Sequence, residues 1–458
     1  MISLLTRTRP PRSGPPTGLV ATAVAGAVGC GVLAAAAPRL ALALALVLVT
    51  LFAVRLLRLS TVELVVVTMP FMFFPPIGFL LNVSVADFLM PVLVVVTWPR
   101  VRDALDPVRR GVLRRFTGLS AVLLFVMLLS GLVAALTLPV FDARDAVLDT
   151  MKLVVVLVYF LTLLAAFLML SERRLLRAAR LWVWCAVAQA AASLVGLAPS
   201  DGTRALGWFQ DPNLYAGYLL TSVALAFYLV ARDRLTGWPV LLLVLLGGVL
   251  ATGSRGGLVA MAALLGLAVV ALLSSRIGTL LMAGGVAGLA VLLFVPDILS
   301  RSLLPGVERL LTSSEAADTD PRWRLWNRAW ELWTDHPLLG VGIGQYPEYS
   351  AGLTPFRNWT EGQVAHNTFL SFAAEGGVLG LLALCAVIGA TALQVRRAAH
   401  LTRMQRAALL LGVVVIVAMM LTLNLQNLRY VWAFFAFAVA AAATRDPEPD
   451  DVRAEAGR

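Results

Sequence analysis

One histidine has the surroundings that acid–base chemistry would need. His366 lies where a long polar segment meets an apolar run, and the chain has only three histidines. An imidazole changes its charge near neutral pH, so a histidine at the mouth of a cavity could act as a general base. A structural role at the start of the following helix is an equal alternative on the residues alone. The other two are less suited, because His400 lies in a basic loop and His336 precedes a proline.

Four arginines in three places could hold an anion. Arg255 lies in a glycine-flanked turn between two apolar runs, where glycines allow a ligand to approach closely. Arg204 lies in a short polar segment, and Arg322 and Arg324 begin a predicted helix, whose N-terminus attracts anions. Because guanidinium groups bind phosphate oxygens in a bidentate manner, the set predicts a diphosphate site. The alternatives are a snorkelling Arg255 and, for the nearby Asn213, capping of the next helix.

The apolar runs around these residues indicate an all-α, polytopic membrane bundle. Hydrophobic residues make up 60% of the 458 residues and charged residues only 14%. A membrane-spanning helix needs about 20 mainly apolar residues. Fourteen spans are predicted, and a short run at 84–98 and prolines within 61–81 leave twelve or thirteen open. The spans are 18–37, 40–57, 61–81, 84–98, 118–137, 151–170, 181–199, 213–231, 238–253, 256–273, 278–297, 367–394, 407–425 and 429–444.

The charges predict the orientation of these spans. Basic clusters at 100–115, 173–180 and 396–406 fall on the same side as the N-terminus if there are fourteen spans, and that side is then cytoplasmic. The net charge of +11 is explained by these loops. No basic patch with interleaved aromatic residues lies on a polar stretch, so no nucleic-acid partner is expected.

A long polar loop at 298–365 is predicted on the outer side, and loops of this length usually have a function. A helix is expected from Pro321, with Asp320 as its N-cap. Four tryptophans share one face of that helix: Trp323, Trp326, Trp330 and Trp333. Indoles favour the headgroup level, so the helix is expected along the outer membrane surface or over a cavity. Packing of the tryptophans onto the bundle is the alternative.

Motifs for common cofactors are absent from the sequence. The Gly342–Gly344 pair has no preceding strand of a dinucleotide fold, and there is no phosphate-binding loop of the Walker type. No aspartate-rich metal motif lies on a predicted outer loop. We therefore expect neither a cofactor nor a metal.

Five segments in this order resemble the O-antigen ligase and O-antigen polymerase superfamily of Wzy type. The segments are Arg204–Asn213, Thr252–Arg255, Arg322–Trp326, Pro337–Gly344 and His366–Leu370, the last followed by Glu375, Gly376 and Gly380. They define a predicted catalytic region at 200–385. The N-terminal helices at 1–199 precede it, and the C-terminal helices and cytoplasmic tail at 386–458 follow.

The resemblance implies a GT-C-like membrane glycosyltransferase in the bacterial plasma membrane, with its active site facing outward. It implies a glycan donor on undecaprenyl diphosphate and a lipid, glycan or protein acceptor, without metal or nucleotide sugar. Arg204, Arg255 and Arg322 would hold the diphosphate, with Arg324 as a lesser candidate, and His366 would be the catalytic base. The supporting residues it implies are Asn213, Asn367 and Glu375. Ligation and polymerisation are not distinguished.

Two other functions compete with this one. A polysaccharide or lipid transporter would be expected to show inverted repeats and charges at the bilayer midplane, but the halves of this sequence show no convincing repeat. A peptidoglycan-type polymerase would be expected to depend on a carboxylate, and the sequence does not single one out.

Overall fold

The computed structural model describes residues 59–72, 84–209, 211–233, 237–272, 321–351, 353 and 363–443. The chain divides into two units at Ser60 and Thr61, and nearly all of the described residues belong to the second unit. The predicted spans at 18–37, 40–57 and 278–297 lie outside the described residues, as do Asp320 and most of the first part of the long loop. The predicted division at 199 and 385 stays a prediction.

The described residues form helices and contain no β-sheet, which confirms the all-α prediction for this part of the chain. Within the described part of the chain, five helices are long and apolar enough to cross a membrane: α6, α7, α9, α17 and α18. The total of fourteen spans stays a prediction. The helices are α3 Thr61–Thr68, α4 Val85–Thr97, α5 Val101–Ala104, α6 Pro107–Thr137, α7 Ala143–Met169, α8 Glu172–Leu194, α9 Pro212–Asp233, α10 Trp238–Ala251, α11 Arg255–Leu272, α15 Pro321–Asp335, α16 Tyr346–Ser350, α17 Thr368–Arg397, α18 Arg403–Met420 and α19 Arg429–Ala443, with a short 3₁₀ turn at Trp98–Arg100.

The helices extend further at their basic ends than the apolar runs predicted. Helix α6 begins at Pro107 rather than at residue 118, because Asp106 caps it by accepting hydrogen bonds from the backbone N–H groups of Val108 and Arg109, both at 2.9 Å. Helix α8 begins at Glu172 rather than at residue 181. The prediction that the arginines of these regions fill loops is therefore wrong. Most of them lie on the first turns of helices, where hydropathy alone places no helix.

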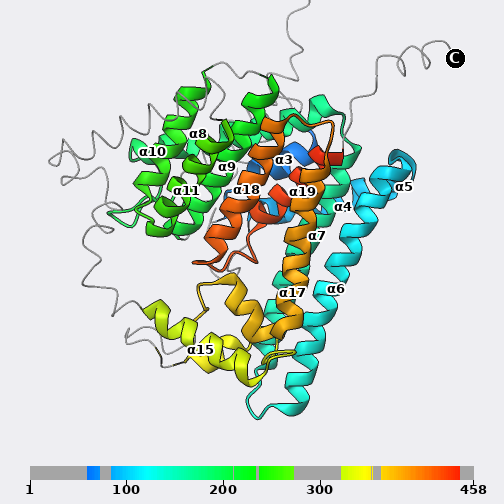
Figure 1. Cartoon of the computed structure of the whole chain (residues 1–458), viewed down its shortest axis with the longest axis vertical. Helices are drawn as coiled ribbons and strands as arrows, with labels where there is room; N and C mark the ends of the chain where they lie inside the picture. Colours follow the sequence, from blue (N-terminus) through cyan, green and yellow to red (C-terminus); the bar gives the residue numbers. More distant parts are fainter. Residues whose placement is uncertain are drawn as a thin grey trace, which may run out of the picture. The chain divides into compact units, whose positions relative to one another are not determined.

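The most deeply buried helix is α19, whose residues from Tyr430 to Ala440 are at most 1% exposed. Helices α7, α9 and α17 contact it, and α6 runs beside α17 (Figure 1). Close approach to α18 depends on Gly412, where an added Cβ would lie 2.1 Å from the ring of Phe434. Membrane helices associate through such packing of small residues, because lipid provides no hydrophobic drive between helices.

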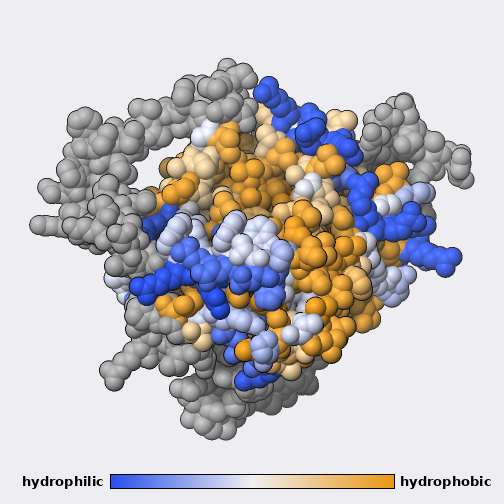
Figure 2. Space-filling view, turned by 60° about the horizontal axis from the view of Figure 1, so that its bottom comes forward, coloured by the Kyte–Doolittle hydropathy of each residue, from blue (hydrophilic) through white to orange (hydrophobic). Residues whose placement is uncertain are grey.

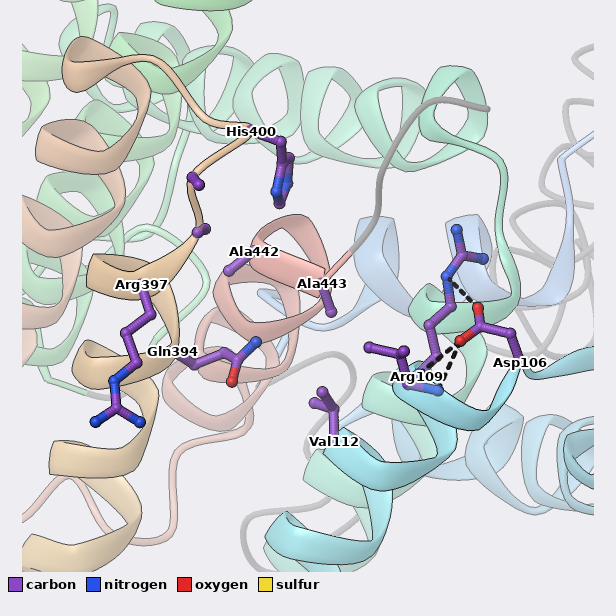
Figure 3. A pocket seen from close by; sticks show the side chains of 11 residues that line it. Asp106, Arg109, Val112, Gln394, Arg397, His400, Ala442 and Ala443 are labelled. Carbon is purple, nitrogen blue, oxygen red and sulfur yellow. Dashed lines mark hydrogen bonds and ion pairs between the residues drawn. The ribbon is translucent and has the colours of Figure 1, made fainter. Parts of the chain in front are cut away.

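The basic residues of the clusters predicted to be cytoplasmic lie at one end of the helices. Arg109 donates to the carbonyl of Leu168 at 3.0 Å, and His400 lies 3.2 Å from the carbonyl of Ala441. Between α6, α17 and α19, a cavity of about 450 Å³ is lined at this end by Arg109, Arg397 and His400 (Figure 3). The starts of α9, α17 and α19 lie at the opposite end. The predicted orientation requires these clusters to lie at one end, and the cytoplasmic assignment itself stays a prediction.

Candidate active site

The segment that carries Arg204 is joined to the turn before Arg255. The N–H of Ala205 donates to the carbonyl of Ala251 at 2.9 Å. The Arg204 side chain donates from Nε to the carbonyl of Thr252 at 3.0 Å, and from Nη2 to Oδ1 of Asn213 at 3.3 Å. Two segments that are 48 residues apart in the chain are thus held together by a guanidinium. The structure therefore brings Arg204, Asn213 and the Thr252–Arg255 turn into one group.

Asn213 does not cap helix α9, so the capping interpretation of this residue is wrong. Asp211 provides the cap, because its Oδ1 accepts from the N–H groups of Asn213 at 2.6 Å and Leu214 at 3.3 Å. The carboxylate outcompetes the amide for this position because it precedes Pro212, which takes the first position of the helix. The Asn213 side chain is left to orient Arg204.

Arg255 is the first residue of helix α11, and its side chain is exposed. The preceding Ser254 accepts from the N–H of Gly257 at 3.0 Å and so caps the helix. At Gly256, an added Cβ would lie 3.0 Å from Oγ1 of Thr422, so the turn packs against the α18–α19 loop. Arg255 thus lies at the positive end of a helix, which reinforces the attraction of its guanidinium for an anion.

His366 has a backbone conformation that is unusual for its residue type. Its φ is +50°, and no other non-glycine residue among those described has a positive φ. Such left-handed residues cost of order 1–3 kcal/mol and are concentrated at functional sites. The cap of α17 is the next residue, since Oδ1 of Asn367 accepts from the N–H of Leu370 at 3.0 Å. The capping role thus falls to Asn367, and His366 stands just outside the helix.

The α18–α19 loop, residues 421–428, holds the start of α17 in place. Asn424 accepts from the N–H of Asn367 at 2.9 Å and donates to Oγ of Ser371 at 3.0 Å. The Thr368 hydroxyl donates to the carbonyl of Leu423 at 2.7 Å and accepts from the N–H of Leu425 at 2.9 Å. Since Thr422 of the same loop packs against the turn of Arg255, the loop lies between the candidate base and the candidate phosphate group.

Helix α15 begins at Pro321, as predicted, and carries Arg322 and Arg324 on its first turn. Arg322 is half-buried and Arg324 is exposed. The helix packs mainly through Leu325, Ala329 and Leu332, which are buried, whereas Trp326 and Trp333 are half-buried and Trp323 and Trp330 are exposed. It is tied to α16 by Tyr346, whose hydroxyl donates to the carbonyl of Leu325 at 2.6 Å. Burial raises the pKa of Tyr346, so this hydroxyl keeps its proton. A place for Arg322 and Arg324 beside the other arginines stays a prediction.

The Pro337–Gly344 segment has a structural role. Helix α17 is broken at Gly377, which has φ 61° and ψ −162°, and an added Cβ there would lie 2.2 Å from the carbonyl carbon of Leu338. The segment runs along this break, with hydrogen bonds from Val341 to Ala374 at 2.9 Å and from Val378 to Pro337 at 2.8 Å. Gly340 and Gly344 of the motif are explained by close backbone contact, because an added Cβ would collide with the carbonyl of Ala374 at Gly340 and with that of Asp145 at Gly344.

Glu375 belongs to the same arrangement. Its carboxylate accepts from the N–H of Tyr346 at 3.2 Å, and its carbonyl accepts from the N–H of Gly342 at 3.0 Å. The side chain is 9% exposed. The contacts of Glu375 thus fix the connection between α15 and α17.

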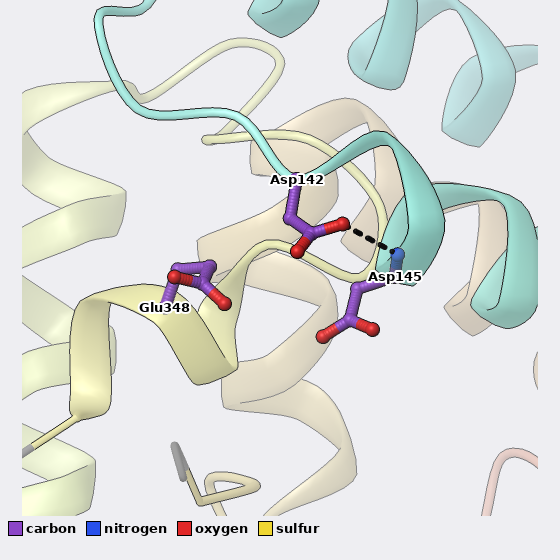
Figure 4. Close-up of side chains that lie close together, drawn as sticks. All are labelled: Asp142, Asp145 and Glu348. Atoms are coloured by element: carbon purple, nitrogen blue, oxygen red, sulfur yellow. Dashed lines mark hydrogen bonds between the residues drawn. The ribbon is translucent and has the colours of Figure 1, made fainter.

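Three carboxylates lie close together beside this connection: Asp142, Asp145 and Glu348 (Figure 4). Their oxygens lie within 4.8 Å of one another. Asp142 is the N-cap of α7, accepting from the N–H groups of Arg144 at 2.7 Å and Asp145 at 3.1 Å. Its backbone exchanges two hydrogen bonds with the Gln345 side chain, at 2.7 and 2.8 Å. Capping and this exchange account for the position of Asp142.

A buried ion pair near the site was not predicted from the sequence. Arg429, the first residue of α19, donates from Nε and Nη2 to the two carboxylate oxygens of Asp87 in α4, at 2.9 and 2.7 Å. Tyr159 of α7 donates to the same carboxylate at 2.6 Å. Arg429 is 8% exposed. The signal in the sequence was a charge beside each of two apolar runs, since charges in such places usually pair with one another.

The comparison with known families covers part of the candidate site. Residues 240–385 match the family described as O-antigen ligase. The matched part contains Arg255, Arg322 and His366, whereas Arg204 precedes it. No curated protein sequence matches the chain. The family match confirms the resemblance for this part of the chain, and it supports a membrane enzyme that acts in the assembly of O-antigen or a related polysaccharide.

Proposed function

We propose that this chain, whose residues 240–385 match the O-antigen ligase family, transfers a glycan from undecaprenyl diphosphate to an acceptor on the outer face of the bacterial plasma membrane. The observation that carries the proposal is the convergence at the 421–428 loop. On one side the loop binds the start of α17 beside His366, and on the other it packs against the turn of Arg255. A general base and a phosphate-binding group at one end of a membrane bundle are what this transfer requires.

The proposed reaction is a direct displacement. The acceptor hydroxyl attacks the anomeric carbon of the donor sugar while His366 takes the hydroxyl proton. The bond between the anomeric carbon and the diphosphate oxygen breaks, and the lipid diphosphate leaves with that electron pair. Arg204, Arg255 and Arg322 stabilise the charge that develops on the leaving group, with Arg324 in a lesser role. One displacement inverts the anomeric configuration.

The supporting residues act on the position of the reacting groups. Asn213 orients the Arg204 guanidinium through its hydrogen bond at 3.3 Å. Asn367 starts α17 directly after His366, and Glu375 anchors the segment that follows α15. Errors of about 1 Å in such placement cost about 100-fold in rate, so these residues matter without touching substrate.

Reconstituted protein with an undecaprenyl-diphosphate-linked glycan tests the proposal. We expect free undecaprenyl diphosphate and a new glycosidic bond of inverted configuration, measured by chromatography of the lipid and by NMR of the product. Movement of intact lipid-linked glycan across the membrane without release of the lipid would contradict transfer and favour the transporter alternative.

A further inference from the structure

The side of α15 that faces away from the core carries a regular line of exposed side chains that the proposed reaction does not use. Trp323 is 63% exposed and Trp330 is 54% exposed, and Asn327 and Thr334 are exposed as well. These positions are separated by four, three and four residues, so they form one line along the helix. The two indoles are two turns apart, about 10.5 Å at a rise of about 1.5 Å per residue.

This line is separate from the surface by which α15 packs. Leu325, Ala329 and Leu332 are at most 3% exposed, and Ala329 and Leu332 belong to the core formed with Val341 and Tyr346. Each exposed indole is braced by a second one: Trp326 lies with its ring centroid 6.0 Å from that of Trp323, and Trp333 lies 5.1 Å from Trp330. Bracing reduces the conformational entropy that an exposed side chain loses when a ligand binds.

The composition of this face favours a carbohydrate over a membrane. All aliphatic residues of α15 are buried, and its other exposed residues are polar: Arg324, Asn327, Glu331, Thr334 and Asp335. A helix that inserts into a bilayer surface combines basic residues with an apolar face of aromatic and aliphatic side chains. Helix α15 carries Arg322, Arg324 and Arg328, but it exposes no aliphatic side chain beside its indoles. The face that comes forward in Figure 2 includes α15 and shows a hydrophilic patch beside a broad hydrophobic surface.

We propose that Trp323 and Trp330 form a binding platform for the sugar chain of the glycan, away from the reacting sugar. The C–H groups of a sugar ring stack on the electron-rich face of an indole, and Asn327 between the two rings offers hydrogen bonds to hydroxyl groups. Because α15 packs against α17, which starts beside His366, a chain that leaves the active site can reach this face. The platform rests on the proposed function and adds to it a site for the extended glycan.

Equilibrium dialysis measures the binding directly. The probe is the labelled, lipid-free oligosaccharide released by mild acid from the host's own lipid-linked glycan, and the protein is the full chain in nanodiscs. We expect Trp323→Ala and Trp330→Ala each to weaken binding by about 2- to 10-fold. Trp323→Tyr should retain most of the affinity. Trp184→Ala is the matched control, because Trp184 is 53% exposed on α8 and should have no effect.

Three outcomes decide between the occupants of this face. Unchanged affinity in the double variant Trp323→Ala/Trp330→Ala would overturn the platform, even if the chain transfers glycan. Quenching of wild-type fluorescence by brominated phospholipid that disappears in the double variant would overturn it in favour of the membrane. Loss of oligosaccharide binding in the double variant supports the platform, even if the wild-type protein fails to transfer glycan, so failure of the proposed function can be distinguished.

Discussion

Breaking the Asp87–Arg429 pair should destabilise the protein and disturb the site together. The pair is bidentate at 2.7 and 2.9 Å, and its side chains are 17% and 9% exposed. Removing one partner of such a buried pair costs about 3–5 kcal/mol, because the other charge is left without compensation. We therefore expect a loss of this size in the free energy of unfolding for Asp87→Asn and for Arg429→Gln.

The double variant is the decisive member of this set. Asp87→Asn/Arg429→Gln leaves no buried charge, so it should cost about as much as one single variant or less. Unfolding in a denaturing detergent, followed by circular dichroism, measures all three variants. Lys152→Gln is the control, since Lys152 is 48% exposed in its pair with Asp149 and should change stability by at most about 1 kcal/mol.

The effect should also reach the activity, because Arg429 directly follows the loop that holds Asn367 and Thr368. The turnover number should fall in the single variants at temperatures where the protein is still folded, with recovery in the double variant. If the double variant cost as much as the two single variants together, the two residues would not be coupled. Single costs under about 1 kcal/mol would show that the pair contributes no more than an exposed one.

Three further predictions concern the scaffold, the anion site and the positioning of the base. Gly377→Ala should lower the free energy of unfolding by about 2–5 kcal/mol, because it adds strain at positive φ to a contact of 2.2 Å between the new Cβ and Leu338. Gly389→Ala in the same helix should leave stability unchanged, because nothing lies within 4 Å of an added Cβ there. Equal melting temperatures of the two variants would contradict this prediction. Arg255→Lys should lower kcat/KM at least about 10-fold, since an ammonium cannot form a bidentate phosphate contact. Arg403→Lys, at the first residue of α18, is the control and should keep full activity. Full activity of Arg255→Lys would show that this position needs only a positive charge. Asn424→Ala should lower kcat more than it changes KM, because the start of α17 loses its hydrogen bond to the loop. Asn424→Asp should keep more of kcat, because its carboxylate still accepts from the N–H of Asn367. An unchanged kcat in Asn424→Ala would show that the loop does not position His366.

The apolar runs predicted the helices well because each run long enough to span a bilayer has one dominant structure. The basic ends were missed, since Arg173, Arg174 and Arg177 read as a loop by hydropathy although arginine is a good helix former and Glu172 favours the helix start. The break in α17 was not foreseen either. It depends on contact between Gly377 and Leu338, which are distant in sequence, and no local pattern encodes such a contact.

Some parts of the candidate site could be predicted from the sequence and others could not. Motif order pointed to His366 and to the arginines, and the link between Arg204 and Thr252 joins two of the segments that carried the resemblance. The Asn424 and Arg429 contacts could not be predicted, because they connect the C-terminal helices to segments 57 and 342 residues away. The cap of α9, by contrast, had a local signal: Asp211 directly precedes Pro212, which takes the first position of the helix, so Asn213 lies too far into the helix to cap it.

His366 is the proposed base for glycan transfer, and a single-turnover assay of His366 variants tests this role. His366→Asn suits the backbone, because asparagine tolerates the left-handed conformation at φ +50° but cannot act as a base near neutral pH. With purified, folded protein and excess enzyme over lipid-linked donor, His366→Asn and His366→Ala should slow transfer about 10²–10⁴-fold, whereas His336→Ala should transfer at the wild-type rate. Transfer by His366→Asn at the wild-type rate would contradict the account.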